Sequence, residues 1–240
     1  MKDDTMVKLA PSILAADFSR LGEEIAAAEN AGADMIHLDI IDGHFAPNVT
    51  FGAAISKMSK KISRLPHDAH LMVTEPENFI DDFIALGADY ITFHIEIGGM
   101  KKILGERRWV YLIDDRPPKE RIESLLEKIK KGNKKAGLTL NPPTEFAPVK
   151  PFLEQVDLLL LMSVNPGFAG QAFIDNVYGK IEQAAEYRHQ AGLSYEIMVD
   201  GGVDLGNAGS LASAGADILV SGSSFFKSGE YAAFVRKLEG

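Results

Sequence analysis

Histidine and aspartate side chains recur within apolar runs of this 240-residue sequence, and both residue types can bind a metal ion or transfer protons. His37 and Asp39 lie two residues apart in the run MIHLDII, so they would project from the same face of a strand. His70 lies in the run HDAHLMV, and Asp200 lies in EIMVDGG. A set of imidazoles and carboxylates suits Zn²⁺, Fe²⁺, Mn²⁺ or Co²⁺, and the residue types do not choose between these ions.

Eight short apolar runs alternate with amphipathic stretches along the chain. Runs that are apolar on both sides of the alternation suit parallel strands covered on both faces. Eight such strands with intervening helices predict an α/β fold, a single-domain (β/α)8 TIM barrel over residues 1–240, with an open doubly wound sheet as the alternative. The expected strands lie within 7–14, 35–41, 67–73, 90–96, 135–141, 158–164, 196–202 and 217–223.

The carboxyl ends of the strands in such a barrel form one rim, where barrel enzymes have their active sites. Taken alone, a buried histidine is commonly a hydrogen-bonded core residue, and an aspartate at a strand end commonly caps the next helix. The joint pattern favours function, because two histidines and two aspartates at corresponding strand ends would converge within metal-binding distance. The residues expected at this rim are Ser12, His37, Asp39, His70, His94, Glu96, Asn141, Asp200, Gly222 and Ser223.

Residues 97–119 are longer than an ordinary connection between a strand and a helix. They contain a β-like run from Trp109 to Ile113, which Pro117 and Pro118 end. We interpret the segment as an insertion after strand four that forms a small extra strand or a lid. Its apolar content argues against a disordered surface loop.

Composition limits the partners of the protein. A formal net charge of −9 argues against nucleic-acid binding, so an anionic substrate would have to be held locally by backbone N–H groups or by a metal. Cysteine is absent, which leaves histidine, aspartate and glutamate as metal ligands. No apolar stretch has the roughly 18–20 residues of a membrane span, and the start MKDDTMVKLA lacks an apolar signal core. We therefore expect a cytoplasmic protein without a membrane partner.

Three glycine-rich loops follow the last three expected strands: VNPGFAGQ, DGG and SGSS. Glycine lets backbone N–H groups approach an anion closely, and barrels commonly bind phosphate with the loops after strands seven and eight. Each loop alone could serve an ordinary turn. Three in succession predict a phosphate site.

Five blocks of the sequence together resemble the signature motifs of the ribulose-phosphate 3-epimerase family. They read APSILAADF, IHLDIIDGHFAPNVTFG, DAHLMVTEPENFI, MSVNPGFAGQAF and VDGGV, in the order of the family, and they cover nearly the whole chain apart from 97–119. The resemblance implies a barrel of the ribulose-phosphate-binding type and an epimerase of carbohydrate metabolism, in the pentose phosphate pathway. The expected reaction is metal-dependent inversion at C3 of a ketose phosphate, D-ribulose 5-phosphate to D-xylulose 5-phosphate, through a 2,3-enediolate.

The resemblance also implies a role for individual residues. His37, Asp39, His70 and Asp200 would bind one divalent metal ion, with no organic cofactor. Asp39 and Asp200 would also act as the two acid/base groups, one on each face of the substrate, while Ser12 and His70 would contact the substrate. The sugar and phosphate site would be lined by Gly167, Phe168, Ala169, Gly170, Gly201, Gly202, Gly222 and Ser223. We further expect a homo-oligomer that binds a small sugar phosphate.

Three departures from the family pattern leave the exact ketose phosphate open. Ile41 replaces a usual methionine, Ala169 replaces a usual glycine, which matters if that position needs a positive φ, and Pro143 replaces a usual glycine. D-Allulose 6-phosphate is the alternative substrate. A lyase of related fold would carry Asp-x-Lys-x-x-Asp after strand two, and no lysine follows Asp39 within that spacing. A non-catalytic binder of sugar phosphates is a further alternative, against which the four retained ligands argue.

Overall fold

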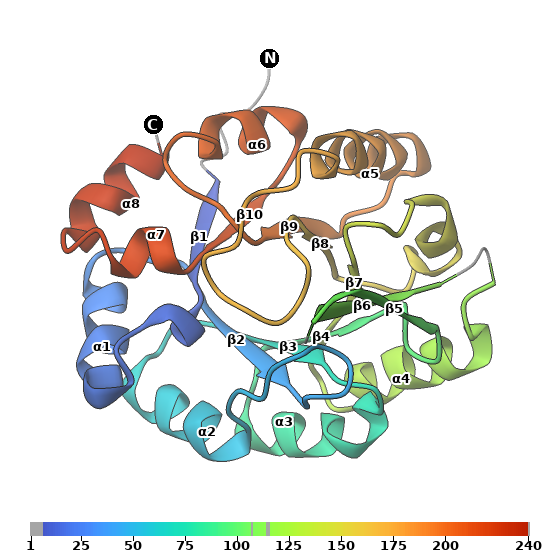
Figure 1. The fold of residues 1–240 in the computed structure, drawn as a ribbon, viewed down its shortest axis with the longest axis horizontal. Coiled ribbons are helices and arrows are strands. Elements are labelled where there is room, and N and C mark those ends of the chain that lie inside the picture. Colours follow the sequence, from blue (N-terminus) through green and yellow to red (C-terminus); the bar gives the residue numbers. More distant parts are fainter. Residues whose placement is uncertain (1–6, 107, 114–115, 240) are drawn as a thin grey trace.

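Eight parallel strands surround a central axis, and helices cover the outside of the strands (Figure 1). A computed structural model describes residues 7–106, 108–113 and 116–239. The barrel expectation is confirmed, because each expected run contains one strand. The strands are β1 (Lys8–Pro11), β2 (Ile36–Ile41), β3 (His67–Met72), β4 (Tyr90–His94), β7 (Lys135–Leu140), β8 (Leu158–Met162), β9 (Glu196–Asp200) and β10 (Ile218–Ser221).

The strand order closes the sheet on itself. Hydrogen-bonded neighbours run β1-β10-β9-β8-β7-β4-β3-β2, and all of these pairs are parallel. A single parallel bridge between Ser12 and His37 joins the two ends of this order. The open doubly wound alternative is therefore wrong.

The helices occupy the positions that a (β/α)8 barrel requires. Gly87 and Gly215 follow α3 (Ile80–Leu86) and α6 (Ala208–Ala214) with φ of 85° and 117°, a left-handed conformation that glycine adopts without a steric penalty. No helix in the described part of the chain has the length and apolar character to cross a membrane. The α-helices are α1 (Leu21–Asn30), α2 (Ala53–Ile62), α3 (Ile80–Leu86), α4 (Lys119–Lys131), α5 (Val177–Ala191), α6 (Ala208–Ala214), α7 (Ser223–Phe226) and α8 (Tyr231–Glu239), and short 3-10 helices lie at Ile13–Ala15, Phe18–Arg20, Pro76–Asn78 and Ala147–Phe152.

The strands alternate between two cores. Leu38 and Ile40 of β2, like Ala69 and Leu71 of β3, belong to the large apolar cluster shared with the surrounding helices. Fully burying such a Leu or Ile side chain stabilises the fold by about 1.5–3 kcal/mol. The alternate positions of the same strands carry His37, Asp39, Asp68 and His70, which therefore point into the barrel.

A β-hairpin lies between β4 and α4 (Figure 1). It consists of β5 (Met100–Gly105) paired antiparallel with β6 (Arg108–Leu112). The strand expected from Trp109 onward is present as β6, whereas β5 was not expected as a strand of its own. Residues 107, 114 and 115 of this segment lie outside the described residues.

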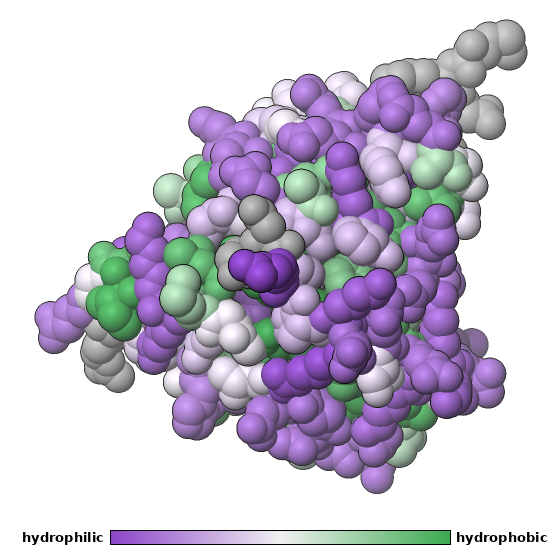
Figure 2. Space-filling view, turned by 90° about the vertical axis from the view of Figure 1, so that its right-hand side faces the viewer, coloured by the Kyte–Doolittle hydropathy of each residue, from purple (hydrophilic) through white to green (hydrophobic). Residues whose placement is uncertain are grey.

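The hairpin is tied to the barrel on one side and exposed on the other. The indole N–H of Trp109 donates to the carbonyl of His44 at 3.0 Å, and the ring of Tyr111 stacks on Phe45 at 4.9 Å. All residues of β5 are exposed, among them Met100 and Ile103. Figure 2, which faces this side of the molecule, shows hydrophobic side chains gathered at the left of an otherwise largely hydrophilic surface.

Candidate metal centre and active site

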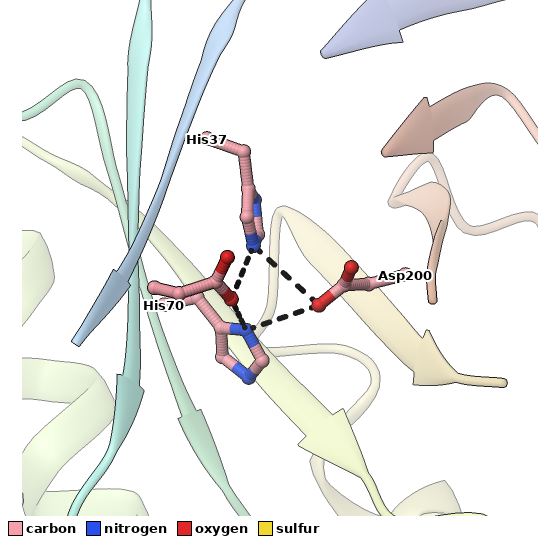
Figure 3. Close-up of side chains that lie close together, drawn as sticks. His37, His70 and Asp200 are labelled. Atoms are coloured by element: carbon pink, nitrogen blue, oxygen red, sulfur yellow. Dashed lines mark ion pairs between the residues drawn. The ribbon is translucent and has the colours of Figure 1, made fainter. Parts of the chain in front are cut away.

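Four side chains from three strands meet inside the barrel. They are His37 and Asp39 of β2, His70 of β3 and Asp200 of β9, and all four are buried. One ligand atom of each lies within 4.8 Å of the ligand atoms of the other three. Figure 3 shows His37, His70 and Asp200 directed toward one shared space. The structure thus brings together the four residues singled out from the sequence.

The strand register explains why these residues meet, and it corrects their expected depth. Asp39 is directly opposite His70 in the parallel pair of β2 and β3. His37 was expected at the end of its strand, but it is the second residue of β2, opposite Asp68. Neighbouring strands of a closed barrel are staggered, so the bridge of His37 to Ser12 places the start of β2 beside the end of β1. The cluster consequently lies below the rim, in the barrel interior.

The distances within the cluster fit a bound cation. His37 Nε2 lies 3.3 Å from Asp39 Oδ1 and 3.6 Å from Asp200 Oδ2. His70 Nδ1 lies 3.5 Å from each of the same two oxygens. Ligand atoms about 2.0–2.1 Å from a tetrahedral zinc ion would be separated by roughly 3.4 Å. Both of these imidazole nitrogens are buried and lack a hydrogen-bond partner, as metal ligands would.

The charges of the cluster are strongly coupled. Burial lowers the pKa of His37, but the charge of Asp39 and the contacts with Asp200 outweigh it, so the pKa is raised well above its ordinary value. Burial raises the pKa of Asp39, but the charge of His37 and the contact with His70 lower it below its ordinary value. Likewise, the pKa of His70 is raised and the pKa of Asp200 is lowered. Ionised carboxylates are the form that binds a divalent cation, and such a cation would displace the imidazole protons that the raised pKa values of His37 and His70 favour.

Each imidazole has a second polar partner on its other nitrogen. His37 Nδ1 lies 3.0 Å from Asp68 Oδ2, and His70 Nε2 lies 2.9 Å from His94 Nε2. His94 Nδ1 in turn lies 3.2 Å from Glu96 Oε2. Asp68 was missed in the sequence, although it lies two residues before His70 and so shares its face. These outer contacts hold both rings in fixed orientations.

Ser12 completes one side of the cluster. Its hydroxyl donates a hydrogen bond to Oδ2 of Asp39, while Oδ1 of the same carboxylate faces the two imidazoles. Ser12 directly follows β1 and is itself buried. This contact fixes the rotation of the carboxylate, so that its second oxygen stays directed into the shared space.

A pocket of about 360 Å³ opens beside Asp39 and Asp200. His70 was expected to contact the substrate, but it is fully buried and does not line this pocket. Ile41, which replaces a usual methionine, lies on the wall of the pocket together with Met72 and Met162. The other residues expected at the sugar and phosphate site all line the pocket: Ser12, Gly167, Phe168, Ala169, Gly170, Gly201, Gly202, Gly222 and Ser223.

Among the described residues that line this pocket, none is a lysine or an arginine. An anion there would therefore depend on backbone N–H groups and hydroxyl groups. Gly201 and Gly202 have φ of 116° and 62°, a backbone conformation that other residues rarely adopt. Ala169 does not need this freedom, because Asn133 is the one non-glycine residue with a positive φ in the described part of the chain. Replacement of a usual glycine by Ala169 thus leaves the loop unstrained.

Comparison with known sequences agrees with these features. The chain matches the model of the Ribulose-phosphate 3 epimerase family over residues 8–226. It is 41% identical over 218 residues to the ribulose-phosphate 3-epimerase of Treponema pallidum, and this alignment covers 91% of this chain and 90% of that protein. It is 39% identical over 224 residues to the ribulose-phosphate 3-epimerase of Escherichia coli K12, which covers 93% of this chain and 90% of that protein.

Solved structures of low sequence identity share the architecture. The tryptophan synthase α-subunit of Pyrococcus furiosus superposes with a TM-score of 0.65 at 16% identity, covering 99% of both chains. The protein KGPDC of Streptococcus mutans superposes with a TM-score of 0.66 at 9% identity, covering 97% of this chain and 95% of the other. At these identities the likeness shows the barrel fold alone.

Proposed function

Because the chain belongs to the ribulose-phosphate 3-epimerase family, whose members are isomerases acting on carbohydrates, we propose that it inverts C3 of D-ribulose 5-phosphate to give D-xylulose 5-phosphate. One observation supports this reaction above all others. Asp39 and Asp200 come from separate strands, share a buried cluster with two imidazoles, and border the same pocket. Inversion requires two such proton-transfer groups, because a single base would tend to restore the starting isomer.

The proton at C3 is weakly acidic, since it lies next to the C2 ketone. A divalent cation held by His37, Asp39, His70 and Asp200 would act as a Lewis acid and stabilise the charge of the 2,3-enediolate. The ligand set suits Zn²⁺, Fe²⁺, Mn²⁺ or Co²⁺. The proposal requires no organic cofactor.

The two aspartates would divide the proton transfers between them. One carboxylate removes the C3 proton from one face of the sugar, and the other returns a proton to the opposite face. The lowered pKa values of Asp39 and Asp200 favour the ionised form, which accepts the C3 proton. The group that returns a proton must carry one when turnover begins, so the two aspartates would exchange these roles with the direction of the reaction. The hydrogen bond from Ser12 would hold Asp39 in the orientation that proton transfer needs.

The glycine-rich loops would bind the substrate phosphate. The loop around Gly170, the pair Gly201 and Gly202, and the turn at Gly222 and Ser223 all border the pocket. Backbone N–H groups can approach an anion closely at such positions. A phosphate held there would place the sugar between the loops and the two aspartates.

We also propose that residues 1–240 form a single barrel domain with an insertion at about 97–119. The position of the β5–β6 hairpin between β4 and α4 supports this division. We infer that the hairpin helps to set the length of sugar that the pocket accepts, because Trp109 of the hairpin and Phe168 of the pocket wall line a common hollow.

The test is metal analysis of the purified protein combined with NMR spectroscopy of sugar phosphates in D₂O. We expect about one divalent ion per chain, interconversion of D-ribulose and D-xylulose 5-phosphate, and deuterium incorporation at C3. Faster turnover of D-allulose 6-phosphate in parallel reactions would instead assign the six-carbon substrate. Release of CO₂, or binding without exchange, would overturn the proposal in favour of a lyase or a sugar-phosphate binder.

The variant Asp39→Asn tests the acid/base role, because it keeps the shape of the side chain and removes its ability to accept a proton. It should fold with the secondary structure of the wild type and lose deuterium exchange at C3. Exchange at the wild-type rate would remove Asp39 from its acid/base role.

A further inference from the structure

A chain of contacts runs from His70 away from the candidate metal centre into β4 and the loop after it. We propose that Glu96 and His94 act as a positioning pair, which holds His70 with its Nδ1 lone pair directed at the metal. This inference rests on the proposed metal centre and deepens it. Neither His94 nor Glu96 belongs to the four-residue cluster.

One proton lies between the two facing imidazole nitrogens of His70 and His94. His70 Nε2 and His94 Nε2 are 2.9 Å apart, and both rings are fully buried. Two N–H groups facing each other at this distance would repel, and two lone pairs would repel as well. One of the two nitrogens must therefore donate and the other accept.

The surroundings of Glu96 decide which nitrogen donates. Its Oε1 accepts a hydrogen bond from the backbone N–H of Asn141 at 2.7 Å and another from the hydroxyl of Thr144. A backbone N–H can only donate, so Oε1 of Glu96 is an acceptor. In the proposed pair the second oxygen is an acceptor as well and receives the Nδ1 proton of His94, 3.2 Å away.

The direction of each hydrogen bond between Glu96, His94 and His70 follows from this. A neutral His94 that donates from Nδ1 presents a lone pair at Nε2, which accepts the Nε2 proton of His70. A neutral His70 that donates from Nε2 has no proton on Nδ1, the nitrogen that lies 3.5 Å from Asp39 and Asp200. A nitrogen facing two carboxylate oxygens without a proton needs a cation between them, and this is the arrangement of a metal ligand.

The pair is sealed from water by packing. His94 and Glu96 are fully buried, and the ring of Phe45 covers His94 at a centroid distance of 4.6 Å. The ring of Tyr111 in the hairpin stacks in turn on Phe45. Because water cannot replace the lost contacts, removing one member leaves buried polar atoms without partners, which is costly.

A merely structural role would differ in its consequences. Glu96 also joins β4 to the loop that contains Asn141 and Thr144, so its loss could lower stability without affecting the metal. The tautomer of His70 and the metal affinity distinguish the two roles, because a structural tie would change neither one specifically.

The first test uses the unmodified protein loaded with Zn²⁺ and labelled with ¹⁵N in its six histidines. Long-range ¹H–¹⁵N correlation spectra report which ring nitrogen of each histidine carries the proton. We expect His94 to be neutral and protonated at Nδ1, and His70 to be protonated at Nε2. A proton on Nε2 of His94 would overturn the proposal, and no variant has to fold for this result.

The second test measures Zn²⁺ affinity by competition with a chromophoric chelator in Glu96→Gln, His94→Phe and the double variant. Glutamine offers one acceptor oxygen to three donors, and phenylalanine keeps the packing on Phe45 without either nitrogen. Each single variant should bind Zn²⁺ about 10- to 100-fold more weakly, and the double variant should be no weaker than the weaker single variant. The pair would be overturned if the losses of Zn²⁺ affinity in the two single variants added up in the double variant, or if both single variants bound Zn²⁺ like the wild type.

Tyr90→Phe is the matched control. It removes a hydrogen bond to Glu196 at the opposite end of the same strand, so it should change stability and leave Zn²⁺ affinity unchanged. Different results would refute the positioning pair and the proposed metal centre. A wild-type protein that binds zinc and epimerises its substrate, but has the other tautomer, overturns the positioning pair alone. A wild-type protein that binds no divalent ion overturns the proposed metal centre as well.

Discussion

Nδ1 of His37 lies 3.0 Å from Oδ2 of Asp68, and both side chains are fully buried beneath the candidate metal centre. A carboxylate at this position orients the ring and makes its opposite nitrogen a better metal ligand. That opposite nitrogen, Nε2, is the atom that faces Asp39 and Asp200. His37 thus reaches a carboxylate in one step, whereas His70 reaches Glu96 through His94.

The variant Asp68→Asn tests this relationship. An amide in place of the carboxylate supports the ring less strongly, so divalent metal affinity should fall by about 10- to 100-fold. Competition with a chromophoric chelator measures the change, and circular dichroism checks the fold. Asp89→Asn, which removes a carboxylate partner of Lys60, serves as the control and should bind metal like the wild type. Unchanged affinity in Asp68→Asn would show that the contact is incidental.

A methyl group at Gly202 should weaken substrate binding. The residue has a φ of 62°, and a Cβ there would lie 3.1 Å from the backbone of Phe173. Backbone strain of about 1–3 kcal/mol, relieved by displacement of the loop from its binding conformation, corresponds to a rise in KM of roughly 5- to 140-fold, since 1.4 kcal/mol is about tenfold. Steady-state kinetics of Gly202→Ala measures this rise. Gly209→Ala is the control, because a Cβ at Gly209 meets nothing within 4 Å. Equal KM values in both variants would argue against phosphate binding by this loop.

The base of the hairpin depends on Gly99. A Cβ at this position would lie 2.1 Å from the carbonyl oxygen of Leu112, so Gly99→Ala must displace one strand of the hairpin. Hydrogen exchange of the amides in β5 and β6 should accelerate in this variant. Gly105→Ala at the far end of β5 has no atom within 4 Å of the new Cβ, and its amides should exchange as in the wild type. If the two variants exchange alike, the hairpin is not anchored at its base.

His67 should make the protein less stable in acid. Burial lowers its pKa to about 4, while its Nδ1 donates to the carbonyl of Leu65 and its Nε2 faces the hydroxyl of Ser59. In the unfolded chain His67 is protonated below its ordinary pKa of about 6.5, whereas in the folded chain it is protonated only below about pH 4. The free energy of unfolding should therefore fall with decreasing pH in this window, by about 1.4 kcal/mol per pH unit for this one group.

Urea unfolding of the wild type and of His67→Gln between pH 4 and 6.5 isolates this contribution. The free energy of unfolding of the variant should depend less steeply on pH, by about one proton. Other titrating groups contribute alike to both proteins. Parallel pH profiles would contradict the prediction and place the acid sensitivity elsewhere.

The barrel and the four-residue cluster could be predicted because both depend on short-range periodicity. Spacings such as His37 to Asp39 place two side chains on one face of a strand, and strands of one barrel bring their inner faces together. The depth of His37 could not be predicted, since it depends on the stagger between strands rather than on the sequence of one strand. The role of Asp68 depends on the same stagger.

The first hairpin strand was missed for a different reason. The run from Met100 to Gly105 is fully exposed, so no apolar alternation marks it. Its pairing with β6 holds it in place. The contacts of His94 with His70 likewise join two strands, and no pattern within either strand indicates that the two rings touch.

The central claim is that four side chains from β2, β3 and β9 bind one cation. Anomalous diffraction from crystals of the metal-loaded protein, recorded on both sides of the absorption edge of the metal, tests it most directly. We predict a single strong anomalous peak within about 2.0–2.2 Å of Nε2 of His37, Nδ1 of His70 and a carboxylate oxygen of each of Asp39 and Asp200. A peak at any other place in the molecule, or no peak in protein that catalyses the epimerisation, would contradict the account.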